Sequence, residues 1–113
     1  MVDVQELNRQ IRMALETGDV ILGANKTIRA LKMGEPKLVI ISMDCPEDIR
    51  EDVEYYAELA EIPVFVYPGT SIELGDACGR PHVVATMAVL DDGESNLLNI
   101  VEQAREEGVE VQG

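Results

Sequence analysis

Residues 20–41 read VILGANKTIRALKMGEPKLVII and hold a strand, a helix and a second strand in succession. The apolar run that opens them is a short strand, closed by Gly23. Apolar side chains at helical spacing then predict a helix from about Asn25, which Gly34 and the proline two residues later end. The last four residues, Leu-Val-Ile-Ile at 38–41, are apolar without interruption, which is typical of a strand buried on both faces.

The same alternation of helices and strands continues on both sides of this stretch. A length of 113 residues suits one domain, residues 1–113. Strands that alternate with helices predict an α/β fold, here a three-layer α/β/α sandwich around a four-stranded mixed sheet. A C-terminal helical extension is expected from about residue 95. Outside 20–41, the expected helices are 3–17, 44–60, 71–77 and 95–107, and the expected strands are 64–67 and 82–90.

The charge of the chain is strongly negative but unevenly distributed. The formal net charge of -13 argues, as a whole, against a nucleic-acid partner, because phosphates repel carboxylates. Residues 20–37, however, carry four cations and one acid, a net charge of +3. Residues 38–67 carry one cation and eight acids, and residues 91–113 one cation and seven acids. The sequence is therefore compatible with a basic patch on an acidic body, with the acidic third helix as a solvated face.

Composition also bounds the class of protein. Hydrophobic residues make up 46% of the chain, enough for a packed core, and no apolar run approaches the roughly 20 residues of a membrane helix. The N-terminus lacks an apolar signal segment, so we expect a soluble, cytoplasmic protein without a membrane partner. Cys45 and Cys78 lie far apart, outside any Cys-x-x-Cys spacing, beside a single histidine. We expect two reduced thiols, at least one of them buried, and neither a metal site nor a cofactor.

The first candidate site is residues 23–27, Gly-Ala-Asn-Lys-Thr, where a strand ends and a helix begins. Glycine lets the backbone turn sharply and lets another backbone approach closely. The amides at the start of the helix favour an anion such as phosphate. Asn25 offers an amide that reads base edges, and Lys26, Arg29 and Lys32 offer charges for phosphates. On these residues alone, a glycine turn followed by an asparagine cap explains the pattern at least as well.

The second candidate site is the segment 69–82, GTSIELGDACGRPH, which follows the third strand. Three glycines and two hydroxyl residues near a strand end are typical of a loop shaped to meet a partner. Arg80 offers a charge to phosphate, and His82 an imidazole that stacks on a base or donates to RNA. The alternative is a structural connection in which Thr70 or Ser71 caps a short helix and His82 has no binding role.

Segments spread over residues 3–98 carry a resemblance to a known family. They are 22–34 (LGANKTIRALKMG), 37–41 (KLVII), 45–46 (CP), 54–60 (EYYAELA), 69–75 (GTSIELG), 77–81 (ACGRP) and 91–95 (DDGES). In this order the chain resembles the archaeal and eukaryotic large-subunit ribosomal protein family L-thirty-e, within the L-seven-Ae superfamily of kink-turn RNA-binding proteins. The EYYA stretch and the 69–81 loop point to L-thirty-e rather than to its relatives. L-seven-Ae itself typically has Asn-Glu where this chain has Asn-Lys at 25–26, which argues against the small nucleolar-type ribonucleoproteins.

The resemblance implies a function and a site. Members of the family bind a kink-turn, an internal loop at which RNA bends sharply beside sheared G·A pairs. The chain would then be a structural component of the large ribosomal subunit that binds and stabilises a kink-turn in ribosomal RNA. Its RNA-binding residues would be Gly23, Asn25, Lys26, Arg29, Lys32, Asp44, Arg80 and His82. The first three would lie against the bent groove, the next two would reach phosphates, and the last three belong to two further loops.

The resemblance also implies partners and leaves one close alternative. The partners would be ribosomal RNA and other large-subunit ribosomal proteins, with the chain a monomer away from the ribosome. The alternative is a kink-turn-binding protein of another ribonucleoprotein, such as a guide-RNA or RNA-processing particle. The RNA contacts of the two would be the same, so the sequence does not separate them.

Two other classes of function fit the sequence less well. An enzyme would pair Cys45 or Cys78 with His82 and orient the histidine through Glu73 or Asp76, but no set of oxyanion donors follows from the sequence. A nucleotide-binding module would use the glycine loops, yet the chain contains neither GxxxxGKS/T nor GxGxxG. We therefore expect no catalytic residues.

Overall fold

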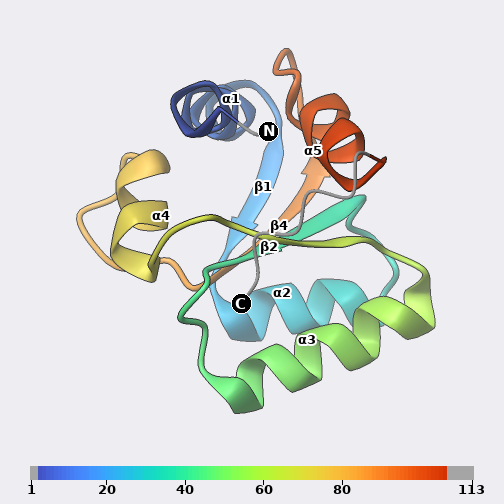
Figure 1. Ribbon diagram of the computed structural model, residues 1–113. Coiled ribbons are helices and arrows are strands. Elements are labelled where there is room, and N and C mark those ends of the chain that lie inside the picture. The colour runs from blue at the N-terminus through green and yellow to red at the C-terminus, as the bar shows by residue number, and fades with distance from the viewer. Residues whose placement is uncertain (1–2, 107–113) are drawn as a thin grey trace.

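The sheet of this protein lies between two layers of helices, as a computed structural model describing residues 3–106 shows (Figure 1). The elements in chain order are α1 (Val4–Thr17), β1 (Asp19–Leu22), α2 (Ala24–Lys32), β2 (Leu38–Ile41), α3 (Glu47–Ala60), β3 (Val64–Val66), α4 (Ser71–Ala77), β4 (Thr86–Asp91) and α5 (Leu97–Glu106). Helices α1, α4 and α5 cover one face of the sheet, and α2 and α3 cover the other. The expected three-layer α/β/α sandwich around a four-stranded mixed sheet is confirmed.

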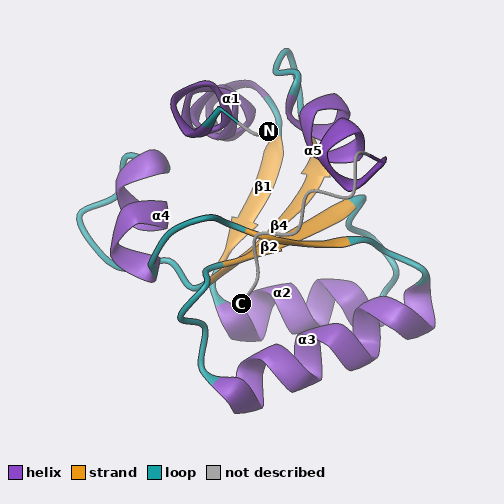
Figure 2. Cartoon of the chain, in the orientation of Figure 1, coloured by secondary structure: helices purple, strands orange, loops and turns teal. Residues whose placement is uncertain are grey.

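The direction of the strands decides which loops can meet. The strand order is β1-β4-β2-β3, with β4 antiparallel to both of its neighbours and β2 parallel to β3. It follows that β1, β2 and β3 run in one direction and β4 runs against them. The carboxyl ends of three strands and the amino end of the fourth therefore share one edge (Figure 2).

The central strand β2 supplies side chains to both halves of the core. Leu38 and Ile40 pack with α1, α4 and α5, whereas Val39 and Ile41 pack with α2 and α3. Successive side chains of a strand point to opposite faces of the sheet. Every side chain of an uninterrupted apolar run is therefore buried only where helices cover both faces. All four side chains are buried, as the sequence predicts.

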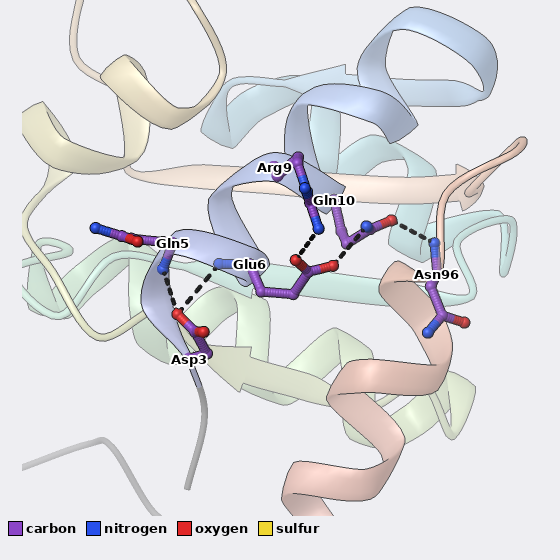
Figure 3. Close-up of polar contacts among 6 residues, drawn as sticks. All are labelled: Asp3, Gln5, Glu6, Arg9, Gln10 and Asn96. Atoms are coloured by element: carbon purple, nitrogen blue, oxygen red, sulfur yellow. Dashed lines mark hydrogen bonds and ion pairs between the residues drawn. The ribbon is translucent and has the colours of Figure 1, made fainter.

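Side-chain hydrogen bonds cap the start of helix α1 and join this helix to the segment before α5 (Figure 3). The Asp3 carboxylate caps the helix, accepting from the amide of Gln5 at 3.0 Å and that of Glu6 at 3.3 Å. Glu6 accepts in turn from the side-chain amide of Gln10 at 2.8 Å. The side-chain oxygen of Gln10 then accepts from the backbone amide of Asn96 at 2.7 Å, which joins α1 to the segment leading into α5.

The strand expected at 82–90 is wrong at its start. Strand β4 begins only at Thr86, and the preceding residues follow α4 instead of the sheet. The amide of Val84 donates to the first carbonyl of α4 at 3.0 Å. A Cβ added to Gly75 of α4 would lie 2.2 Å from the carbonyl oxygen of His82, so helix and loop are in direct backbone contact. A short apolar run gives the same pattern in a partly buried loop as in a strand, which is why periodicity misassigns it.

The C-terminal helix is part of the main core. It begins at Leu97, two residues later than expected, and its Leu97, Val101 and Ala104 side chains are buried with those of α1. The predicted end of this helix at Glu107 and the remaining residues to 113 lie outside the described part of the chain. Among residues 3–106, no helix combines the length and apolar character needed to cross a membrane.

Candidate nucleic-acid interface

Four loops gather at the shared edge of the sheet, which we call the loop end. They are the junction between β1 and α2 at Gly23 and the loops 42–46, 67–70 and 78–85. The eight residues expected to bind RNA all lie in these loops or on α2, which starts there. All eight are exposed. Sequence segments more than 50 residues apart are therefore brought to one surface by strand direction alone.

Backbone hydrogen bonds hold the loops of this end together. Strand β4 accepts one bond at its first residue, loop 78–85 accepts a second and loop 67–70 a third. The bonds run from the Gly23 amide to Thr86 O, from the Ser42 amide to Ala85 O and from the Met43 amide to Gly69 O, each 2.9 Å long. A site built on loops that are bonded to one another and to strand ends presents its side chains in a fixed arrangement.

Gly23 forms an uncapped start to α2. Its φ of +112° is a conformation that glycine adopts without strain, and a Cβ placed there would meet nothing within 4 Å. The surface above Gly23 is therefore open to another backbone. No side chain caps this helix and no acid lies in its first turn, so the amides of that turn point outward unscreened. The asparagine cap that the sequence alone allowed is not formed, since Gly23 occupies the N-cap position and Asn25 lies within the helix.

The side chains of Asn25, Arg29 and Lys32 lie along one side of α2. Their spacing of four and then three residues brings successive side chains onto the same helical face. The ammonium group of Lys32 lies 5.0 Å from the ring centroid of Tyr56 on α3, a cation–π contact that restrains the side chain. Lys26 is exposed on the first turn beside Asn25.

The cations of α2 and Arg80 have no carboxylate partner within residues 3–106, and neither has Lys37 at the opposite end of the sheet. Elsewhere, arginines pair with acids of their own helices, in the pairs Arg9–Glu6, Arg12–Glu16, Arg50–Glu54 and Arg105–Glu102. Within residues 3–106, none of Lys26, Arg29, Lys32 and Arg80 forms an ion pair with a carboxylate. A chain with 22 acids leaves these four positive charges available to an anion.

Asp44 holds two loops together. Its carboxylate accepts from the backbone amide of Ser71 at 2.8 Å and from the Ser71 hydroxyl at 3.4 Å, joining loop 42–46 to the start of α4. The Ser42 hydroxyl, and after it the Ser71 amide, favour the ionised form and hold the pKa of Asp44 below its usual range. The carboxylate is thus an ionised acceptor at neutral pH, already engaged within the protein.

Arg80 and His82 stand on the loop that follows α4. The Arg80 amide donates to the carbonyl oxygen of Gly75 at 2.9 Å, and a ring nitrogen of His82 lies 3.2 Å from the carbonyl oxygen of Val83. Gly79 gives the loop its turn, with φ of +73°. The loop is therefore pinned to α4 by its backbone while both side chains face solvent.

Three exposed apolar side chains at the loop end were missed by sequence reasoning. Met43, Ile72 and Val83 are 50%, 63% and 59% exposed, respectively. They belong to three segments that are bonded to one another through Met43–Gly69 and Val84–Ser71. In the sequence, Ile72 falls in the expected helix 71–77 and Val83 in the expected strand 82–90, whereas Met43 lies between two expected elements. Their common exposure follows only from the tertiary arrangement. Exposed apolar groups beside unpaired cations suit a partner with both charge and flat apolar faces, as nucleic-acid bases have.

The thiol–histidine pair that an enzyme would need is not assembled. Cys78 is fully buried, and burial raises the pKa of its thiol to about 11. Burial also raises the pKa of Cys45, whose sulfur lies 3.7 Å from the hydroxyl of Thr86. A nucleophilic cysteine needs a lowered pKa and an adjacent base, and neither thiol has them. In the described part of the chain, no cluster of three or more His, Cys, Asp or Glu side chains is suited to a metal ion.

Comparison with known proteins gives a family and a set of close relatives. The model of the Ribosomal protein L7Ae/L30e/S12e/Gadd45 family matches residues 5–99. The large ribosomal subunit protein eL30 of Methanopyrus kandleri is 70% identical over 105 residues, covering 93% of this chain and 96% of that protein. The eL30 protein of Methanothermobacter thermautotrophicus is 49% identical, covering 85% and 98% of the two chains. These names describe no enzyme activity, in agreement with the expectation of a non-catalytic protein.

A solved structure supports the fold independently. A Bacillus halodurans protein of unknown function superposes with a TM-score of 0.75 at 25% sequence identity. The superposition covers 88% of this chain and 99% of the other. The same arrangement of layers is therefore found in a relative whose sequence has changed at three quarters of its positions.

Proposed function

Because the chain belongs to the Ribosomal protein L7Ae/L30e/S12e/Gadd45 family, we propose that it is a component of the large ribosomal subunit that binds and stabilises a kink-turn in ribosomal RNA. Its location would be the ribosome in the cytoplasm, and its neighbours would be ribosomal RNA and other large-subunit proteins. In this proposal residues 1–113 act as a single RNA-binding domain, monomeric away from the ribosome. The alternative is that the chain binds a kink-turn of another ribonucleoprotein through the same RNA contacts.

One observation carries the proposal. Four cations that form no ion pair within residues 3–106 lie at the loop end or lead away from it, in a protein whose net charge is -13: Arg80 in loop 78–85, and Lys26, Arg29 and Lys32 along α2. Unpaired positive charges favour a phosphate partner, because binding neutralises them and releases the counterions that surround the nucleic acid. The same end presents the uncapped start of α2, which attracts anions through its free amides. Charge and backbone therefore both favour a phosphate chain at this surface.

A bent RNA fits the loop end better than a straight duplex does. The open surface above Gly23 lets a sugar–phosphate backbone approach within contact of α2, and Asn25 beside it reaches base edges with an amide that both donates and accepts. Arg29 and Lys32 continue along α2 and would neutralise phosphates of one strand. We call the exposed side chains of Asn25, Arg29 and Lys32 along α2 the α2 ridge. Both strands flanking the bend of a kink-turn would lie against the α2 ridge, whereas a straight helix would meet it at one point.

Loops 42–46 and 78–85, together with the start of α4, would meet bases that the kink unstacks. Met43, Ile72 and Val83 form exposed apolar surface, and unstacked bases bind such surface through their flat faces. Arg80 and His82 would add a phosphate contact and a stacking or donor group on the same loop. Asp44 enters the proposal through its bonds to Ser71, which set the distance between loop 42–46 and α4.

The acidic body of the protein is compatible with this partner because many of its acids lie away from the loop end. Helix α5, with two acids, follows β4 at the opposite edge of the sheet. Helix α3, with six, begins at loop 42–46, so Glu47 and Asp48 of its first turn stand beside the loop end and the others lie further along the helix. Salt screens the repulsion between such distant charges and RNA over about 10 Å at 0.1 M ionic strength. Direct contacts at the ridge are shorter than this length and are screened less.

Two alanine substitutions separate base reading from phosphate binding. Asn25→Ala should weaken binding of a kinked RNA by about 1–3 kcal/mol and that of a straight duplex far less, since Asn25 meets base edges only at the kink. Lys32→Ala should weaken both RNAs similarly and lower the salt slope by about 1. Titrations of both variants against both RNAs at several salt concentrations measure this. Equal losses of affinity for the two RNAs in Asn25→Ala would show that Asn25 does not read the kink.

A further inference from the structure

The loop after α4 carries the single histidine of the chain, and its ring is bonded within the protein. The ring nitrogen Nδ1 of His82 lies 3.2 Å from the carbonyl oxygen of Val83. A carbonyl oxygen only accepts hydrogen bonds, so the proton between the two atoms belongs to Nδ1. A neutral imidazole carries one proton on its nitrogens, and the other nitrogen, Nε2, is then an acceptor. The proton that the neutral ring could donate to a partner is therefore already engaged in the loop.

The carbonyl group that orients the ring is itself held by the backbone. The Val84 amide belongs to the same peptide unit as the Val83 carbonyl and donates to the carbonyl oxygen of Ser71 at 3.0 Å. Because the N–H and C=O of a trans peptide point in opposite directions, the Val83 carbonyl faces away from Ser71. The preceding peptide unit is fixed as well, since the carbonyl oxygen of His82 would lie 2.2 Å from a Cβ placed on Gly75. The exposed ring of His82 is thus anchored both at its backbone and at Nδ1.

The Nε2 acceptor differs from most groups expected to bind RNA at the loop end. Lysine and arginine side chains only donate hydrogen bonds, and so do the uncapped amides in the first turn of α2. The Asp44 carboxylate accepts, but it is already engaged by the amide and the hydroxyl of Ser71. Within residues 3–106, Nε2 of His82 has no hydrogen-bond partner. Donors suit phosphate oxygens, whereas an acceptor such as Nε2 requires a hydrogen-bond donor in the RNA.

We propose that Nε2 of His82 accepts a hydrogen bond from the RNA bound at the loop end, so that this residue discriminates between RNAs that offer the same phosphates. Since the contact requires RNA at the loop end, it rests on the proposed function. The donor is a ribose 2′-hydroxyl or a base amino group, because the phosphates carry no donor. A 2′-hydroxyl would make the contact specific for RNA over DNA, and an amino group would make it specific for the base.

One substitution separates accepting from stacking and from phosphate binding. His82→Phe keeps a flat ring without nitrogens, and it should lower the affinity for kinked RNA roughly fivefold, as expected for one lost hydrogen bond, with the salt slope unchanged. Full affinity would show that the ring only stacks on a base. A salt slope shallower by about 1 would show that it binds phosphate as a cation. Either result would overturn the proposal.

The matched control is Tyr55→Phe, which removes the polar group of another exposed ring, on α3. It should change neither the affinity for kinked RNA nor the salt slope. Because both rings are exposed, urea unfolding of the two variants should match that of the wild type.

Modified RNAs identify the donor and test the bond itself. Kink-turn RNAs with single 2′-deoxy nucleotides, or lacking single base amino groups, each miss one donor. One of them should bind the wild type about fivefold more weakly, yet bind His82→Phe as well as the unmodified RNA does, because the bond is already absent there. The modification with this behaviour assigns the donor to the sugar or to the base. Equal costs of every modification for both proteins would overturn the proposal.

The acceptor role of His82 and the recognition of the kink fail in different experiments. Equal affinity of the wild type for kinked and straight RNA would contradict kink recognition, whichever group His82 contacts. Kink-selective binding in which no RNA modification depends on His82 would leave the proposed function in place and overturn the acceptor role alone.

Discussion

Replacing Gly75 with alanine should lower both the stability of the protein and its affinity for RNA, although Gly75 is buried and touches no partner. The new Cβ would lie 2.2 Å from the carbonyl oxygen of His82, a distance at which the backbone must move. Loop 78–85 cannot simply withdraw, because the Arg80 amide bonds to the carbonyl of Gly75 at 2.9 Å. Overpacking of this kind costs about 1–3 kcal/mol of unfolding free energy, and more where backbone resists.

The loss of RNA affinity follows from the same displacement. Arg80, His82 and Val83 stand on the loop that must move, so the kinked RNA would lose three contacts at once, and we expect its affinity to fall at least tenfold. Urea unfolding and RNA titration of Gly75→Ala measure the two effects. The control is Asp76→Ala, an exposed position on the same helix, which should change neither. Full RNA binding by Gly75→Ala would show that this loop does not contribute to the site.

Reversing two charges on α2 should reduce RNA binding more than any other change that leaves the core intact. Arg29→Glu with Lys32→Glu removes two phosphate contacts, each a charge-assisted hydrogen bond of about 1.5 kcal/mol, so the affinity should fall on the order of a hundredfold. The salt slope should become shallower by about 2. Both substitutions are on the exposed side of the helix, and the fold should persist.

The matched control reverses two charges elsewhere. Arg9→Glu with Arg105→Glu changes the net charge by the same -4, from -13 to -17, at two arginines that already pair with acids. If the local ridge binds RNA, this variant keeps an affinity within a few fold of the wild type at moderate salt, where distant charges are screened. Equal losses in the two variants would mean that total charge, not the α2 ridge, controls the interaction.

The elements with a strong local pattern were predictable from the sequence. The four apolar residues of β2, the stop at Gly34 and the short helix Ser71–Ala77 are found where the sequence places them. Each depends on a local rule, such as the capping box in which Thr70 and Glu73 satisfy each other's backbone amides. The exception is the segment 82–85. Its apolar residues match a strand, but the close approach of Gly75 from another element holds them off the sheet.

The candidate site was predictable in its residues but not in its arrangement. Gly23, Asn25 and the cations of α2 were indicated by the junction of strand and helix, and the structure adds that Arg80 lies at the same end of the sheet. That Met43, Ile72 and Val83 are exposed there could not be predicted, because exposure depends on which loops meet. Nor does spacing reveal that the Asp44 carboxylate is already bonded to Ser71, 27 residues away.

The central claim, that the loop end recognises a kink in RNA, is tested most directly by one measurement. The purified protein is titrated against a kink-turn RNA and a straight duplex of the same length over a range of salt concentrations. We expect tight binding of the kinked RNA, with a preference over the duplex that persists as salt rises and non-specific phosphate binding declines. Equal affinity for the two RNAs at every salt concentration would contradict the account, because the surface would then bind phosphate without recognising the bend.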